Sequence, residues 1–151
     1  MTTEALLAYA HFLAILTLAA FLSSEAALCR KEWINAAVVE RLARIDAIYG
    51  AAAIAVLLTG LARACWGMKG LAWYASQPLL LTKVALFLVI GLISIAPTLR
   101  FRHWRKTLRA TGALPSEAEV HSTRRLVMIE AHLLVVIPLF AVFLARGIGT
   151  R

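Results

Sequence analysis

The sequence predicts an all-α integral membrane protein, folded as a four-helix up-down bundle. Of its 151 residues, 62% are hydrophobic, whereas soluble domains are roughly 45–50% apolar. Four apolar runs, at 5–28, 46–66, 78–97 and 126–144, approach or exceed the ~20 residues that a helix needs to cross a bilayer. Backbone polar groups in lipid must be bonded within the segment, so these runs are predicted to be helices. We therefore predict a single transmembrane domain over 1–151.

The basic residues predict how this bundle is oriented. Eleven of the 16 Lys and Arg residues lie in the two connections 27–45 and 99–125. The positive-inside rule places both connections in the cytoplasm and both termini outside, here across a bacterial inner membrane. The net charge of +8 then reflects orientation and contact with anionic headgroups. We expect a lipid bilayer as the partner, and no nucleic acid.

The first run is predicted to be retained as a true span. It is too long for the core of a signal peptide, and no small-residue cleavage site follows it. The second run leads into an aromatic connection at 61–77, which carries Trp66, Trp73 and Tyr74. Such rings favour the headgroup level, so this connection is expected to lie at the membrane surface.

The third and fourth runs carry signals for where their helices begin and end. Pro97 is predicted to end the third helix, because proline disfavours helix in the residue before it. The basic segment around Trp104 is predicted to form a separate, short amphipathic helix on the cytoplasmic surface. Ser116–Glu119, directly after Pro115, is typical of a helix start that leads into the fourth span.

Three ionisable residues are predicted to meet near the outer leaflet. Counting ~1.5 Å of rise per residue, His11 lies about 9 Å, Lys83 about 7 Å and Arg63 about 5 Å below the outer edge of its span. Ionisable groups inside a membrane segment are costly, and they usually mark a functional site. The alternative is that Lys83 and Arg63 extend to the headgroups while His11 bonds a carbonyl.

The chemistry of this layer fits a haem. A neutral imidazole in a bundle of low polarity is a good iron ligand, which makes His11 the candidate axial ligand of a haem b. Arg63 and Lys83 suit the two propionates, because buried carboxylates need paired charge. A desolvated Lys83 could instead bind iron as the second ligand or act as a base.

A second polar layer is predicted near the cytoplasmic side. His11 and Glu25 are fourteen residues apart, close to four helical turns, and therefore share a face of the first helix. Glu130 and His132 are two apart and point in nearly opposite directions, so they cannot both face the bundle centre. His132 is an alternative second axial ligand, but it lies about 12 Å deeper than His11. The layer comprises Glu25, Arg44, Asp46, Tyr49, Ser94, Thr98, Arg125 and Glu130.

Several segments resemble those of a bacterial family of predicted inner-membrane proteins of unknown function. The resemblance covers nearly the whole chain. It is carried by Tyr9-Ala10-His11, by the segment Arg44-Ile45-Asp46-Ala47-Ile48-Tyr49-Gly50, by Lys69-Gly70, by Lys83-Val84-Ala85-Leu86-Phe87 and by Ser94-Ile95-Ala96-Pro97-Thr98.

More distantly, the chain is similar to HemJ-type protoporphyrinogen oxidases, which are small haem-binding helical membrane proteins. His11 matches a histidine early in their first span, and Lys83 matches a lysine at the start of a later span. Glu130 matches the acidic residue of an Asn-Glu pair, with Ile129 in place of the asparagine. The resemblance implies a b-type haem and tetrapyrrole oxidation. The departures at Ile129 and His132 bear on the oxidase activity more than on the haem.

Three functional hypotheses follow. The first is a haem b-binding membrane protein with a redox role, either electron transfer or oxidation of a membrane-soluble substrate. Its partners would be a quinone, a porphyrin or an electron-transfer protein, with a homodimer as one assembly, and whether it is an enzyme stays open. The second is a metal or small-solute carrier, with Glu25, Asp46 and Glu130 as an inner relay. The third is a structural membrane subunit without a cofactor.

Overall fold

The computed structural model describes residues 2–66 and 78–146, and these form four long helices. They are α1 (Thr2–Leu28), α2 (Ala36–Trp66), α4 (Pro78–Thr111) and α5 (Glu117–Ala145). Each is long and apolar enough to cross a membrane. The predicted all-α membrane bundle is confirmed. The predicted interfacial residues Trp73 and Tyr74 lie outside the described residues.

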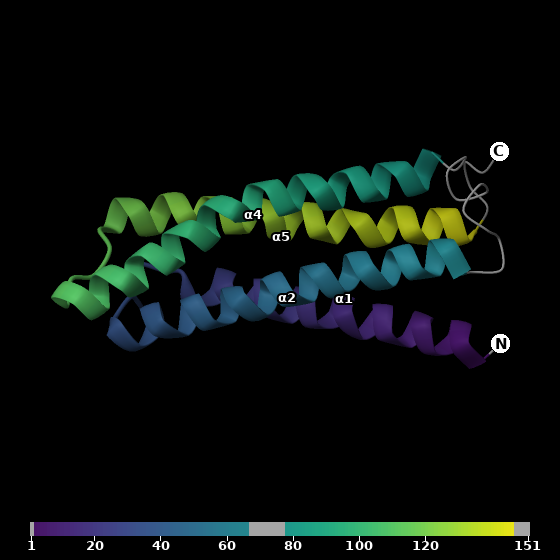
Figure 1. Ribbon diagram of the computed structural model, residues 1–151. Helices are drawn as coiled ribbons and strands as arrows, with labels where there is room; N and C mark the ends of the chain where they lie inside the picture. Colours follow the sequence, from purple (N-terminus) through teal and green to yellow (C-terminus); the bar gives the residue numbers. More distant parts are fainter. Residues whose placement is uncertain (1, 67–77, 147–151) are drawn as a thin grey trace.

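The four helices lie side by side along their length (Figure 1), and the contacts between them close a ring. α1 packs against α2 and α5, and α4 packs against the same two helices. α1 therefore lies diagonally opposite α4, and α2 lies opposite α5. We call the end where α1 begins and α2 ends the terminal end, and the opposite end the basic end.

Pro97 does not end the third helix, which corrects the prediction. α4 is continuous from Pro78 to Thr111, and the segment around Trp104 is its second half. Pro97 removes one backbone donor and usually kinks a helix. Figure 1 shows α4 changing direction partway along its length. Pro97 is buried in the bundle, where packing against neighbouring helices tolerates such a break.

The predicted start of α5 is confirmed in atomic detail. The backbone N–H of Ser116 donates to Glu119 Oε2 over 2.9 Å, and the N–H of Glu119 donates to Ser116 Oγ over 3.3 Å. This reciprocal pair is a capping box. At the preceding helix end, Gly112 has a φ of 74°, and its N–H donates to the carbonyl of Leu108. Glycine adopts this left-handed conformation without steric cost and so ends α4.

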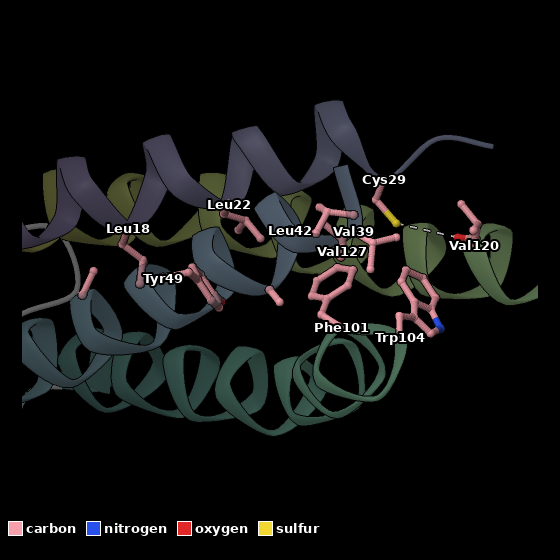
Figure 2. Close-up of a cluster of buried hydrophobic side chains, with 12 residues drawn as sticks. Leu18, Leu22, Cys29, Val39, Leu42, Tyr49, Phe101, Trp104, Val120 and Val127 are labelled. Carbon is pink, nitrogen blue, oxygen red and sulfur yellow. Dashed lines mark hydrogen bonds between the residues drawn. The ribbon is translucent and has the colours of Figure 1, made fainter. Parts of the chain in front are cut away.

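The fully buried apolar core lies in the basic half of the bundle. Leu18, Leu22, Leu42 and Phe101 are all at most 1% exposed, and Figure 2 shows them meeting between the helices. In the described parts of the terminal third, no side chain is fully buried over 2–13, 57–66, 78–89 and 131–143. The outward faces carry large apolar residues such as Leu6, Ile54, Leu92 and Val135. Such faces suit contact with lipid.

Beyond the predicted spans, polar contacts join the basic ends of the helices. Arg109 of α4 donates two hydrogen bonds to the Glu40 carboxylate of α2, of 2.6 and 2.8 Å. The hydrogen bond from Arg109 lowers the pKa of Glu40 below its ordinary value. Arg124 of α5 donates to the carbonyls of Ala26 and Cys29 at the end of α1. This last contact satisfies carbonyls that a helix end leaves unpaired.

Candidate functional site

His11 is held by a hydrogen bond to α2 near the terminal end. Its Nδ1 lies 2.8 Å from Thr59 Oγ1. Thr59 Oγ1 also lies 2.6 Å from the carbonyl oxygen of Ala55. Two oxygens this close need a proton between them, and only the threonine hydroxyl carries one. The hydroxyl therefore donates to Ala55, and His11 Nδ1–H must donate to Thr59.

This assignment fixes which ring nitrogen of His11 is available. In a neutral imidazole, one nitrogen is a donor and the other carries a lone pair. With the proton on Nδ1, the lone pair is on Nε2. A histidine that donates its other N–H to an oxygen is the usual arrangement of an oriented metal ligand. His11 thus presents the nitrogen that binds metals or accepts protons.

The absence of a side chain at Gly60 brings the His11 ring close to α2. A Cβ built on Gly60 would lie 3.2 Å from His11 Cε1 and 3.8 Å from His11 Nδ1. The first distance is tighter than an ordinary van der Waals contact. Glycine at this position lets the imidazole pack directly on the α2 backbone, one residue from its partner Thr59.

Arg63 and Lys83, which the sequence analysis groups with His11, lie toward the same terminal end of the bundle. Arg63 lies one turn beyond Thr59 on α2, and Lys83 projects from α4, on the diagonal from α1; both are half-buried. The positive charges of both residues interact electrostatically with the His11 imidazole. The charge of Arg63 also interacts with that of Lys83. Over residues 2–66 and 78–146, the ion pairs are Lys31–Glu117 and Glu40–Arg109. The cations of the terminal site therefore have no carboxylate partner within that part of the chain.

Glu130 and His132 face opposite ways, as their spacing predicted. Glu130 is 1% exposed and points into the bundle. His132 is exposed on the outer face of α5, where its Nδ1 lies 2.6 Å from the carbonyl oxygen of Met128 in its own helix. The chain on its own therefore does not bring His132 together with His11. Its role as a second axial ligand stays a prediction.

The second polar layer forms a buried cluster of carboxyl groups, which we call the inner carboxyl cluster. It consists of Glu25 of α1, Asp46 of α2 and Glu130 of α5, each at most 3% exposed. Tyr49 donates to Glu130 over 3.1 Å and Thr98 donates to Asp46 over 2.6 Å. On α1, the buried residues Ala14, Leu18 and Leu22 separate this cluster from His11. Arg44 and Arg125, which the sequence grouped with this layer, are exposed instead.

Sequence reasoning missed the part played by Thr59. Threonine is common in helices, and its hydroxyl usually bonds its own helix, as it does here with Ala55. The available signal was its spacing, four residues before Arg63 and next to Gly60, on the face of α2 that points to α1. Depth along the sequence also does not show that the carboxyl groups of Glu25 and Asp46 are buried in the bundle, at 1% and 3% exposed, and not at the headgroups.

Comparison with known proteins assigns nearly the whole chain to one family. The model of the family described as predicted membrane protein (DUF2214) matches residues 3–149. The chain belongs to this family. The match confirms a membrane protein of unknown function, and a similarity to HemJ-type oxidases is not shown by it. No curated protein matches the chain, and no solved structure matches it.

Proposed function

We propose that this protein binds haem b at the terminal site and has a redox role in the membrane. His11 is the proposed axial ligand, through Nε2. The observation that carries the proposal is the hydrogen bond from His11 Nδ1 to Thr59, because it leaves Nε2 unprotonated and holds the ring in one orientation. A bound haem would supply one-electron chemistry, with a potential set by its axial ligands and surroundings.

The residues around His11 fit the group. Arg63 and Lys83 are half-buried cations without carboxylate partners in the described chain. A buried cation is stabilised by a paired anion, and the two propionates of a haem would be such anions. Lys83 is the alternative second ligand, since it comes from the helix diagonally opposite His11. Thr59 and Gly60 act as positioning residues, because they fix the imidazole by a hydrogen bond and by close packing.

The finer assignments extend this proposal. We propose a bacterial inner membrane, with the basic end of the bundle in the cytoplasm, on the distribution of Lys and Arg. Electron transfer and oxidation of a membrane-soluble substrate, such as a quinol or a tetrapyrrole, are the two redox roles to compare. A homodimer and a protein electron partner stay predictions of the sequence.

The test is an absorption spectrum of the detergent-purified protein, produced with ample haem supply, in the oxidised and the dithionite-reduced state. We expect a Soret band, with sharp α and β bands on reduction, and loss of these bands in His11→Ala. The matched control is His103→Ala, which removes an exposed histidine and should leave the spectrum unchanged. Thr59→Val keeps the side-chain shape but removes the acceptor of His11, and should weaken haem retention.

Two results would overturn the proposal. One is a colourless wild-type protein despite ample haem. The other is a haem spectrum that His11→Ala leaves intact. Loss of the spectrum in His132→Ala, with His11→Ala unaffected, would move the ligand to the outer face of α5 and so to a partner molecule.

A further inference from the structure

The inner carboxyl cluster contains three buried carboxyl groups, and the residues around it supply too little positive charge for all three to be ionised. Glu25 and Glu130 are each 1% exposed and Asp46 is 3% exposed. Asp46 and Glu130 both act electrostatically on Glu25, and Asp46 acts on Glu130. The three groups therefore share one site. Like charges buried together cannot all ionise, because the energy of an unpaired buried charge is large.

Hydrogen-bond donors reach two of the three groups. The Tyr49 hydroxyl crosses the bundle from α2 to Glu130 Oε2 of α5. The Thr98 hydroxyl of α4 reaches Asp46 Oδ1 over 2.6 Å. Glu25 Oε1 and Glu130 Oε1 are buried and have no hydrogen-bond partner in the part of the chain that the structure describes. A buried acceptor without a donor is rare in native proteins and calls for an explanation.

The charges around the cluster are unevenly placed. Arg102 of α4 is exposed and acts electrostatically on Asp46. Arg124 of α5 faces the end of α1, where it bonds Ala26 and Cys29. The ion pairs among residues 2–66 and 78–146, Lys31–Glu117 and Glu40–Arg109, leave the cluster without a bonded cation. Asp46 has both a short donor and a cation within range, whereas Glu25 has neither.

We propose that the inner carboxyl cluster is a proton-binding site, in which Glu25 carries the proton and Asp46 the negative charge at neutral pH. A proton on Glu25 removes its charge and turns one carboxyl oxygen into a donor. The titratable groups within electrostatic range of Glu25 are Asp46 and Tyr49 from α2, Glu130 from α5, and Cys29 at the end of its own helix. The nearby cations act on other members of this group: Arg102 of α4 on Asp46, and Arg124 of α5 on Cys29.

A proton fits the cluster better than a metal ion does. Over the described residues, no three His, Cys, Asp or Glu side chains are grouped so that they could hold a metal. Apolar side chains bound the cluster on both sides, with Leu18 and Leu22 toward the terminal end and Phe101 toward the basic end, all at most 1% exposed. Carboxyl groups in such surroundings within membranes are typical of proton-relay sites.

The proton site is independent of the proposed haem site. Ala14, Leu18 and Leu22 lie between His11 and Glu25 on the buried face of α1. None of these side chains can pass a proton, so the buried face of α1 provides no relay between the two sites. The test below needs no haem, and failure of one proposal leaves the other standing.

The test is infrared spectroscopy of the full-length protein in lipid, in H₂O and in D₂O, across a pH series. At neutral pH we expect the carbonyl stretch of a protonated carboxylic acid, shifted in D₂O. Glu25→Gln should remove most of this band. The matched control is Glu32→Gln, which changes an exposed carboxylate and should leave the band intact. Absence of the band in the wild type, or its full persistence in Glu25→Gln, would overturn the proposal.

A second measurement separates protons from cations. The carboxylate bands are recorded at constant pH while NaCl, KCl or CaCl₂ is added in turn. We expect no specific shift. A saturable shift with one cation, lost in Glu25→Gln, would overturn the proton assignment and favour the carrier hypothesis. If Glu25→Gln does not fold, Thr98→Val provides the fallback: by removing the donor that holds the charge on Asp46, it should change the distribution of the proton and shift the acid band.

Discussion

His11 and Glu25 share the buried face of α1, but their surroundings give them different chemistry. His11 is half-buried, and its Nδ1 has an oxygen partner in Thr59. Glu25 is almost fully buried, and its Oε1 has no partner among the described residues. Their common face followed from the sequence spacing alone. Their different surroundings did not, because these depend on the residues that the other helices contribute.

At the residue scale, Tyr49→Phe should destabilise the bundle. The tyrosine hydroxyl is the hydrogen-bond donor to Glu130 Oε2, and its loss leaves both oxygens of the Glu130 carboxyl group without a partner among the described residues. The free energy of unfolding should fall by about 1–3 kcal/mol. Denaturant unfolding in lipid–detergent micelles measures this change. Tyr9→Phe is the control, since Tyr9 is 64% exposed; equal stability of the two variants would contradict the assigned role of Tyr49.

At the element scale, α4 shows where local sequence signals fail. Pro97 was predicted to end the third helix, yet the helix continues for fourteen residues beyond it to Thr111. The next residue, Thr98, bonds Asp46 of α2 across the helix interface. Contacts of this kind with other helices stabilise α4 around Pro97. They cannot be predicted from the sequence of α4 alone. In contrast, the capping box at Ser116 and Glu119 is local, and it was predictable.

Gly60→Ala, a change on α2, should disturb the His11 ring of α1. The new Cβ would lie 3.2 Å from His11 Cε1, so the imidazole must move by a few tenths of an ångström and weaken its bond to Thr59. Nitrogen NMR of labelled histidine should show the His11 ring signals shifting from those of the Nδ1-protonated form.

Gly91→Ala is the matched control on α4. A Cβ there meets nothing within 4 Å, and alanine should stabilise the helix by about 0.5–1 kcal/mol relative to glycine. His11 signals that are unchanged in Gly60→Ala, or changed as much in Gly91→Ala, would refute the proposed packing of the imidazole on α2.

At the scale of the whole molecule, the sequence predicted the bundle well because the membrane restricts the possible folds. Four apolar runs of spanning length leave few alternatives to four helices. What was not predictable is the uneven core, which is dense around Phe101 and Leu42 and absent from the described terminal third. Part of that core lies beyond the predicted spans, because α2 and α4 extend at the basic end and contribute Leu42 and Phe101.

The predicted orientation can be tested with the two cysteines. Cys65 is exposed near the terminal end, whereas Cys29 is buried at the basic end. Burial raises the pKa of the Cys29 thiol to about 12, so this thiol should be unreactive. A membrane-impermeant maleimide should therefore label Cys65 from outside intact cells.

Thr111→Cys in a chain with Cys65→Ser is the matched probe for the basic end, because Thr111 is exposed at the end of α4. This variant should be labelled only after the membrane is opened. The reverse pattern would invert the topology.

The measurement that tests the central proposal most directly is chemical rescue of His11→Gly. The purified variant should lack the Soret band, and free imidazole should restore it, because the added ligand can occupy the position that the histidine ring has left. Restoration that saturates with imidazole would establish His11 as the axial ligand. A wild-type spectrum in His11→Gly before any imidazole is added would contradict the account.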